Sequence, residues 1–213
     1  MATSDEKSDP RSRNALFSAR TWKGYVRQYA HDLEAALEQV SETALDGAYV
    51  AITTAVHAQR RVFVAGNGGS AAIADHLCCD WTKGTHAAGL VPLRTHSLVS
   101  NVALLTAVAN DFGYDDAFAR QLEMLGVSGD VILLISSSGN SPNVLAAADK
   151  AKAMGIATIG MTGFGGGALA KRVDFALHVP YANYGLVEDC HQILMHTFAQ
   201  LFAKEREGGA SPT

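Results

Sequence analysis

The sequence predicts an α/β fold, a doubly wound, five-stranded parallel sheet flanked by helices, with extra helices at its N-terminal end. From Arg61 onward, short apolar runs of strand length alternate with stretches that have helical spacing. One run, DVILLIS at 130–136, is nearly continuous Val, Ile and Leu, as expected for a strand buried on both faces. Strand alternating with helix implies right-handed crossovers and a parallel sheet covered on both sides.

The region before the sheet, residues 21–59, is rich in Ala, Leu, Glu and Gln and predicts two helices. Apolar residues recur there at helical spacing in two stripes. The stripes are Leu33, Leu37 and Val40, followed by Leu45, Ala48, Ile52 and Val56. Packing against the core explains these stripes, and an interface between subunits would use the same kind of surface.

The remaining elements follow in order along the chain. Strands are expected at 62–66, 91–98, 130–136, 156–161 and 174–179. Helices are expected at 70–81, 98–109, 141–154 and about 187–205. This organisation gives one domain over residues 21–205, with a flexible N-terminal tail at 1–20 and a flexible C-terminal tail at 206–213.

Composition excludes several classes of protein. A net charge of −4 without a Lys/Arg stripe argues against nucleic-acid binding. No apolar run reaches the roughly 18–20 residues that a membrane span needs, and the polar N-terminus lacks the apolar segment of a secretory signal. Three cysteines, two of them adjacent, do not form a disulfide framework, so we expect a cytoplasmic protein.

Two loops have a composition suited to holding a phosphate. Residues 66–70 (GNGGS) follow the first strand, and residues 136–141 (SSSGNS) follow the third, each leading into a helix. Glycines allow close backbone approach, hydroxyls donate hydrogen bonds, and free N–H groups at a helix start attract anions. Either loop alone is also explained by ordinary turn and cap chemistry. The loops match neither a dinucleotide fingerprint nor a P-loop, and the GFGGG run at 163–167 is expected to be a mobile turn.

Two helices each carry a carboxylate and an imidazole on one face. His76 and Asp80 are four residues apart, and Glu188 and His196 are eight apart, with His191 between them. Together these side chains suit a metal site with nitrogen and oxygen ligands, although a single such pair is usually a surface pair. Cys79 and Cys190 are the nearby thiols, and we expect both to be small apolar side chains rather than ligands. Tyr181 and Tyr184 come just before the last expected helix, and we expect them to form a flap.

Taken together, GNGGS, ANDFGYDD and ISSSGNSPNV resemble the SIS (sugar isomerase) domain family and, within it, the phosphoheptose isomerases. The resemblance covers about residues 61–202 and implies a flavodoxin-like SIS fold. It also implies a set of substrate-contacting residues. They are Asn67, Gly68, Gly69, Ser70, Asn110, Asp111, Ser136, Ser137, Ser138 and Ser141.

The same resemblance implies a metal site, usually zinc, held by a His and a Glu on the first of these helices and a Gln and a His on the last. His76 and His196 match, whereas Asp80 stands in place of the Glu and Glu188 in place of the Gln. We expect Zn²⁺ or another divalent ion to be retained and held more tightly because of the added charge. Proton transfer at carbon is then shared between Asp80 and Glu188 or has moved to Glu188, with His196 acting at the oxygen.

The activity implied is aldose–ketose isomerisation of a phosphosugar through an enediol. The expected substrate is sedoheptulose 7-phosphate and the product D-glycero-D-manno-heptose 7-phosphate, which feeds nucleotide-heptose biosynthesis, in a homotetramer with sites built between subunits. Two alternatives stay open. One is a non-catalytic SIS protein that senses a phosphosugar or serves as a scaffold, and the other is an isomerase or lyase of a different phosphosugar.

Overall fold

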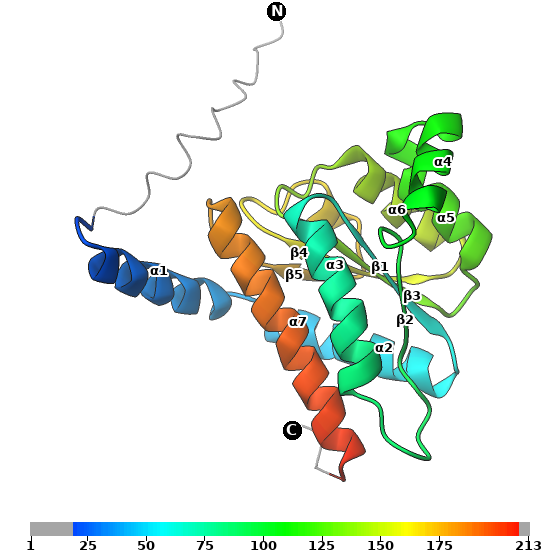
Figure 1. Cartoon of the computed structure of the whole chain (residues 1–213), viewed down its shortest axis with the longest axis horizontal. Coiled ribbons are helices and arrows are strands. Elements are labelled where there is room, and N and C mark those ends of the chain that lie inside the picture. The colour runs from blue at the N-terminus through cyan, green and yellow to red at the C-terminus, as the bar shows by residue number, and fades with distance from the viewer. Residues whose placement is uncertain (1–18, 209–213) are drawn as a thin grey trace, which may run out of the picture.

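The computed structural model describes residues 19–208 and confirms the α/β fold (Figure 1). Of the tails expected at 1–20 and 206–213, residues 1–18 and 209–213 lie outside the described residues, and Arg206 is the last residue of a helix. Five parallel strands form one sheet in the order β2-β1-β3-β4-β5. The strands are β1 (Arg61–Gly66), β2 (Arg94–Ser97), β3 (Val131–Ser136), β4 (Ala157–Thr162) and β5 (Phe175–His178).

Helices cover both faces of this sheet (Figure 1). The α-helices are α1 (Trp22–Leu37), α2 (Glu42–His57), α3 (Gly69–Cys79), α4 (Val102–Phe112), α5 (Ala117–Leu125), α6 (Pro142–Ala153) and α7 (Tyr184–Arg206). A π-helical turn, η2 (Asp80–Gly84), extends α3, and two 3₁₀ turns are η3 (Tyr114–Asp116) and η4 (Leu169–Lys171).

Alternate residues of the strands face two separate apolar layers, as a doubly covered sheet requires. Val64 and Leu133 pack under α2, α3 and α7, together with Ile52 and the other buried residues of the N-terminal helices. Phe63 and Leu134 pack on the opposite face under α5 and α6. The predicted N-terminal stripes are therefore part of the core.

Side-chain caps define where several helices begin. Thr21 and Ser41 accept hydrogen bonds from backbone N–H groups in the first turns of α1 and α2. Asn101 and Asn183 do the same for α4 and α7. These caps leave the beginnings of the helices satisfied by the chain itself.

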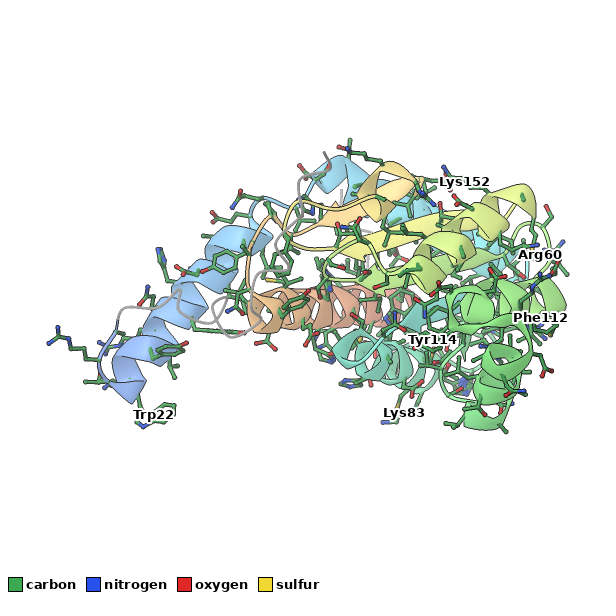
Figure 2. All side chains as sticks on the ribbon, turned by 90° about the horizontal axis from the view of Figure 1, so that it is seen from above. Trp22, Arg60, Lys83, Phe112, Tyr114 and Lys152 are labelled. Carbon is green, nitrogen blue, oxygen red and sulfur yellow. The ribbon has the colours of Figure 1, made fainter. Side chains whose placement is uncertain are left out.

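The N-terminal helix is set apart from the rest of the chain. In Figure 2, α1 extends away from the sheet and carries Trp22 near its far end. Trp22 is 89% exposed and Val26, one turn later on the same face, is 63% exposed. The middle of α1 is tied to the body, because Tyr29 donates a hydrogen bond of 2.5 Å to Asp189 on α7.

The strand order places the site. Strand β1 lies between β2 and β3, so the chain turns in opposite directions after β1 and after β3. In sheets of this order, ligands bind in the crevice that opens beyond the carboxyl ends of these strands. The glycine loop follows β1 and the serine loop follows β3, so both predicted loops lie at this crevice.

Candidate functional site

The two predicted phosphate loops line one cavity of about 200 Å³ at the carboxyl ends of β1 and β3. The glycine loop and the serine loop form much of its wall, and the start of α7 contributes the rest. The lining residues are Asn67, Ser70, Ile135, Ser136, Ser137, Ser138, Ser141, Tyr184 and Glu188. Helix α3 begins at this cavity, and the positive end of its dipole favours an anion there.

The glycine loop needs glycine for two different reasons. Gly68 has a φ of 56°, in the left-handed region that favours glycine. At Gly66, a Cβ atom would lie 2.7 Å from the Ser70 Cβ and 2.9 Å from the Ile135 carbonyl oxygen. The loop therefore turns sharply and packs tightly against both the helix and the neighbouring strand.

The serine loop presents hydroxyl groups with different partners. The Ser136 and Ser141 hydroxyls lie 3.1 Å apart, and the Ser138 hydroxyl accepts a hydrogen bond from the Asn140 backbone N–H. The Ser137 hydroxyl is buried and has no hydrogen-bond partner within residues 19–208. Because a buried hydroxyl without a partner is costly, this group is well suited to a polar ligand.

Asn143 and Tyr114, which the sequence pattern did not single out, hold the glycine loop in place through Asn67. Asn67 and Asn143 exchange side-chain hydrogen bonds of 2.8 and 2.9 Å, and the Tyr114 hydroxyl donates to the Asn67 amide oxygen at 2.7 Å. Asn143 is buried in the first turn of α6. The Asn67 side chain is thus engaged within the protein.

The GFGGG segment at 163–167 supports the serine loop, so its expected role as a mobile turn is wrong. The Gly163 N–H donates to the Ser137 carbonyl at 2.8 Å, and the Ala168 N–H donates to the Asn140 side chain at 3.0 Å. A Cβ atom at Gly139 would lie 2.1 Å from the Gly166 carbonyl oxygen. The glycines allow two loops to pack backbone against backbone, which a count of glycines does not distinguish from mobility.

Asn110 and Asp111, which the resemblance assigns to the substrate, do not line this cavity. Both are exposed near the end of α4, and the Asn110 amide donates to the Asp111 carboxylate at 3.0 Å. Within one copy of the chain, the structure does not bring this pair to the loops.

Helices α3 and α7 run side by side in the same direction away from the loops (Figure 1). Along this pairing, Gly69 lies beside Glu188, His76 contacts Gln192, and Asp80 lies beside His196. The site therefore forms a row, with the phosphate loops at one end and the imidazoles at the other.

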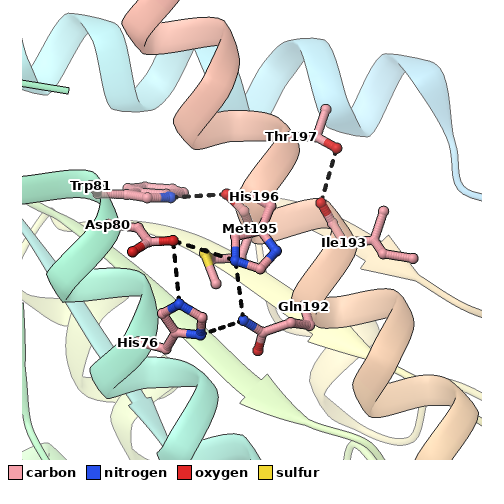
Figure 3. Close-up of polar contacts among 8 residues, drawn as sticks. All are labelled: His76, Asp80, Trp81, Gln192, Ile193, Met195, His196 and Thr197. Carbon is pink, nitrogen blue, oxygen red and sulfur yellow. Dashed lines mark hydrogen bonds and ion pairs between the residues drawn. The ribbon is translucent and has the colours of Figure 1, made fainter. Parts of the chain in front are cut away.

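His76, Asp80 and His196 form a group that can hold a metal ion (Figure 3). The Asp80 Oδ2 atom lies 3.3 Å from His76 Nε2 and 3.3 Å from His196 Nε2. Asp80 is the first residue of the π-helical turn, a feature that frequently occurs at functional sites. The expected pairing of His76, Asp80 and His196 is thus present in the structure.

Gln192 is the fourth side chain of this cluster, and the sequence pattern did not identify it. Its amide nitrogen lies 2.6 Å from His76 Nδ1 and 3.5 Å from His196 Nε2 (Figure 3). Spacing alone contained a signal, because Gln192 precedes His196 by one helical turn and so shares its face.

Glu188 does not join this group, contrary to our expectation. It lies eight residues before His196, about 12 Å along the helix axis, and helical side chains lean toward the N-terminus, away from His196. Its carboxylate instead lies at the start of α3, where a Cβ atom on Gly69 would be 2.5 Å from either oxygen. The positive end of the α3 dipole attracts a carboxylate there.

The environment of Glu188 shifts the pKa of its carboxyl upward. Burial raises the pKa of the Glu188 carboxyl, and the neighbouring Asp189 carboxylate raises it further. The Glu188 side chain has neither a hydrogen bond nor an ion pair within residues 19–208. A carboxyl with a raised pKa beside a cavity is a candidate for proton transfer.

Most of the other polar and aromatic side chains near the site belong to the scaffold. Trp81 is fully buried, and its indole N–H donates to the Met195 carbonyl at 3.0 Å. His191 is also buried, which lowers its pKa to about 4, and Cys190 lies in the core. All three cysteines are free, and none belongs to the metal-binding group. Tyr181 is held by a 2.7 Å hydrogen bond to Asp32, whereas Tyr184 lines the cavity.

The structure contains no candidate for a membrane span: within residues 19–208, no helix has the necessary length and apolar character.

Comparison with known proteins agrees with this architecture. Residues 25–163 match the SIS domain family model. A phosphoheptose isomerase of Helicobacter pylori (strain Shi470) is 39% identical over 164 residues, covering 77% of this chain and 84% of the relative. A phosphoheptose isomerase of Mycobacterium bovis (strain BCG / Pasteur 1173P2) is 43% identical over 140 residues, covering 66% and 71% respectively.

Among solved structures, a phosphoheptose isomerase from Francisella tularensis superposes with a TM-score of 0.78 at 28% identity. The match covers 85% of this chain and 96% of that one. On the family model, the sequence identities and the shared fold, the chain belongs to the SIS domain family, in its phosphoheptose isomerase group.

Proposed function

We propose that this protein isomerises sedoheptulose 7-phosphate to D-glycero-D-manno-heptose 7-phosphate. The observation that carries the proposal is the row of side chains along α3 and α7, from the cavity at the phosphate loops to the His76–Asp80–His196 group. Membership of the phosphoheptose isomerase group supports the choice of substrate.

The length of this row suits a seven-carbon sugar phosphate. Gly69 and His76 are seven residues apart, which is about 10 Å along α3. An extended seven-carbon chain with a terminal phosphate is also on the order of 10 Å long, from C–C bonds of about 1.5 Å. With its phosphate at the serine loop, the substrate's carbonyl end would reach the imidazoles. Anchoring the phosphate positions the reacting end.

In this proposal the phosphate is held without being cleaved. The Ser137 hydroxyl, which has no partner within residues 19–208, donates to a phosphate oxygen. Ser70, Ser136, Ser138 and Ser141 complete the polar lining. We expect the backbone N–H groups of Gly68 and Gly69, at the beginning of α3, to donate to the phosphate as well. Asn67 keeps its role of holding the loop through Asn143.

We assign the transfer of the carbon-bound proton to Glu188. The reaction removes a proton from C1 while the C2 carbonyl oxygen gains one, which gives an enediol. A proton then returns to C2 while the C1 hydroxyl loses one, which gives the aldose. Asp80 is engaged by two imidazoles, whereas the Glu188 carboxylate is free of such contacts and has a raised pKa. Glu188 precedes Gln192 by one turn, so its side chain can swing from the α3 terminus toward the reacting carbons.

The same three residues suit a divalent metal, which we take to be Zn²⁺. Two imidazoles and one carboxylate are a donor set typical of catalytic zinc, which keeps a fourth position open. Ligand atoms on a tetrahedral zinc ion lie about 3.3–3.4 Å apart, from bond lengths of about 2.0–2.1 Å. The two 3.3 Å separations at Asp80 Oδ2 match that geometry. When bound, the ion polarises the substrate carbonyl and stabilises the negative charge of the enediol.

We also propose a cytoplasmic homotetramer. Three free cysteines suit a reducing compartment. Asn110 and Asp111 lie outside the cavity of their own copy and would complete the site of a neighbouring one. Exposed apolar side chains on α1 and α4 provide surface for that contact.

Incubation of the purified protein with sedoheptulose 7-phosphate in D₂O tests the activity directly. We expect an aldose product detected by NMR, with deuterium at C2 because the transferred proton exchanges with solvent. Glu188→Gln should lower kcat by about 10²–10⁴-fold, the usual contribution of a positioned acid or base. Ser137→Ala should mainly raise KM, while Ser128→Ala, at an exposed serine outside the cavity, should leave both constants unchanged.

The alternatives give different results in the same experiment. Binding of the sugar phosphate without turnover would indicate a sensor or scaffold, and turnover of a different phosphosugar alone would change the substrate. A Glu188→Gln protein with full activity beside an inactive Asp80→Asn protein would move the proton transfer to Asp80.

A further inference from the structure

Gln192 has a position that the metal-binding group itself does not explain. Its amide lies against both imidazoles, 2.6 Å from His76 Nδ1 and 3.5 Å from His196 Nε2 (Figure 3). It comes from α7, whereas His76 comes from α3, so the contact bridges the two helices that form the site. The question is what this amide does for the imidazoles.

The tautomer of His76 depends on which amide atom faces it. A neutral imidazole carries one proton, so one ring nitrogen donates and the other has a lone pair. If the amide nitrogen faces Nδ1, then Nδ1 accepts and Nε2 carries the proton, which leaves no lone pair for a metal. If the amide oxygen faces Nδ1, then Nδ1 donates and Nε2 offers its lone pair beside Asp80 Oδ2.

Metal binding through His76 Nε2 requires the second arrangement. The amide is drawn with its nitrogen toward both rings, but the oxygen and nitrogen of an amide are assigned from the surrounding network. His196 Nε2 lies 3.3 Å from Asp80 Oδ2. When a metal is bound, His196 Nε2 gives its lone pair to the ion and donates a hydrogen bond to neither neighbour. His76 Nε2 can bind the same ion only if the proton of this ring is on Nδ1, and Nδ1–H then needs an acceptor, which the Gln192 amide supplies when its oxygen faces inward.

The oxygen-inward arrangement places the His76 Nε2 lone pair 3.3 Å from Asp80 Oδ2. Two such acceptors repel each other unless a cation lies between them, so the arrangement is organised for a metal ion. Imidazoles that bind metals commonly donate their other ring N–H to an oxygen acceptor, which fixes both tautomer and orientation.

We propose that Gln192 is a positioning residue, which accepts a hydrogen bond from His76 Nδ1–H and thereby directs the His76 Nε2 lone pair to a divalent metal. This inference rests on the proposed metal site but not on the identity of the sugar. It gives the chain a metal-orienting amide on α7, one turn before His196, while Glu188 stays at the substrate cavity.

Zinc affinity of three variants tests the role of Gln192. Competition with a chromophoric chelator measures Zn²⁺ binding by the wild-type protein, Gln192→Met and Gln192→Glu, with Gln200→Met as an exposed control two turns further along α7. Methionine removes the acceptor at similar size, and we expect zinc binding to weaken by about 10–100-fold. Glutamate restores an acceptor and should bind zinc at least as tightly as the wild type, and Gln200→Met should be unchanged.

Two spectroscopic measurements separate positioning from a structural effect. In the zinc-loaded wild type, ¹⁵N NMR should show His76 protonated at Nδ1, independently of any variant. Co²⁺ in place of zinc should give the same absorption bands in the wild type and Gln192→Glu. His76 protonated at Nε2, wild-type zinc affinity in Gln192→Met, or no rescue by Gln192→Glu would overturn the proposal.

Altered Co²⁺ bands in Gln192→Glu would make Gln192 a direct ligand, which also overturns it. A wild-type protein that isomerises the sugar but binds no zinc would overturn this inference and leave the activity intact. If the variants bind zinc with the expected relative affinities but the wild type does not turn over the sugar, this inference stands and the proposed isomerase activity is overturned.

Discussion

Among single residues, Glu188 is the one to which we assign the transfer of the carbon-bound proton. Its carboxylate lies between the phosphate loops and the imidazoles, and burial and the Asp189 carboxylate both raise its pKa. A raised pKa brings a carboxyl closer to the working pH, where a general acid–base group is most efficient. Asp189 itself does not line the cavity, so a substitution at Asp189 changes the charge next to Glu188 without changing the cavity wall.

Asp189→Asn should shift the pH profile of kcat/KM. If Glu188 acts as the base, activity is lost as the pH falls through its pKa. Asparagine removes a negative charge that raises this pKa, so the pKa falls and the acid limb of the profile moves to lower pH. Asparagine also keeps an oxygen that accepts the hydrogen bond from Tyr29.

Asp46→Asn is the matched control, because it removes the same charge from an exposed position on α2. Its profile should coincide with that of the wild type. An acid limb that stays in place in Asp189→Asn would assign the proton transfer to another group.

The sequence predicted the site residues unevenly, for physical reasons. His76 and Asp80 share a helix and a fixed spacing, so their proximity follows from helical geometry. The contact between Gln192 and His76 depends on how two helices pack, and nothing in either helix alone specifies it. The direction of the Glu188 side chain likewise depends on the charge at the end of α3.

At the scale of elements, the parallel pairing of α3 and α7 brings the site residues of the two helices opposite each other. Both helices begin at the phosphate loops, so equivalent turns face each other along their length. The tightest point is at the beginning, where Gly69 leaves space for the Glu188 carboxylate. This glycine therefore determines where the carboxylate lies.

Gly69→Ala should lower kcat by about 10–100-fold while preserving the fold. A Cβ atom there would lie 2.5 Å from the Glu188 oxygens, so the carboxylate must move by about 1 Å, a displacement that can cost 10²-fold in rate. Gly84→Ala is the control, because a Cβ atom at Gly84 meets nothing within 4 Å. Circular dichroism and steady-state kinetics check both variants, and a wild-type kcat in Gly69→Ala would contradict the role given to this contact.

The elements themselves were largely predictable from the sequence. All five strands occur within or next to their expected ranges, because continuous apolar runs in a doubly covered sheet are distinctive. Helix α5 was not predicted, since nine residues are too few for a clear helical period. The π-helical turn at Asp80 was not predicted either, because it replaces the last turn of a regular helix.

At the scale of the whole molecule, two helices expose apolar surface that a single copy does not use. On α1, Trp22 and Val26 are 89% and 63% exposed, while the other face of the helix contacts α7. On α4, Val102 and Phe112 are 65% and 48% exposed. Exposed tryptophan and neighbouring apolar residues are typical of contacts between proteins.

We therefore expect light scattering to give a mass near four times 22.5 kDa for the wild type. The double variant Trp22→Ser, Val26→Ser should dissociate at concentrations where the wild type stays assembled. A buried tryptophan at an interface commonly contributes 2 kcal/mol or more, which corresponds to roughly a 30-fold weaker association. Met124→Ser is the control, since Met124 is 56% exposed but lies on α5 rather than on α1 or α4. If Asn110 and Asp111 complete a neighbouring site, turnover should fall with dissociation, and a monomeric wild type with full activity would contradict both expectations.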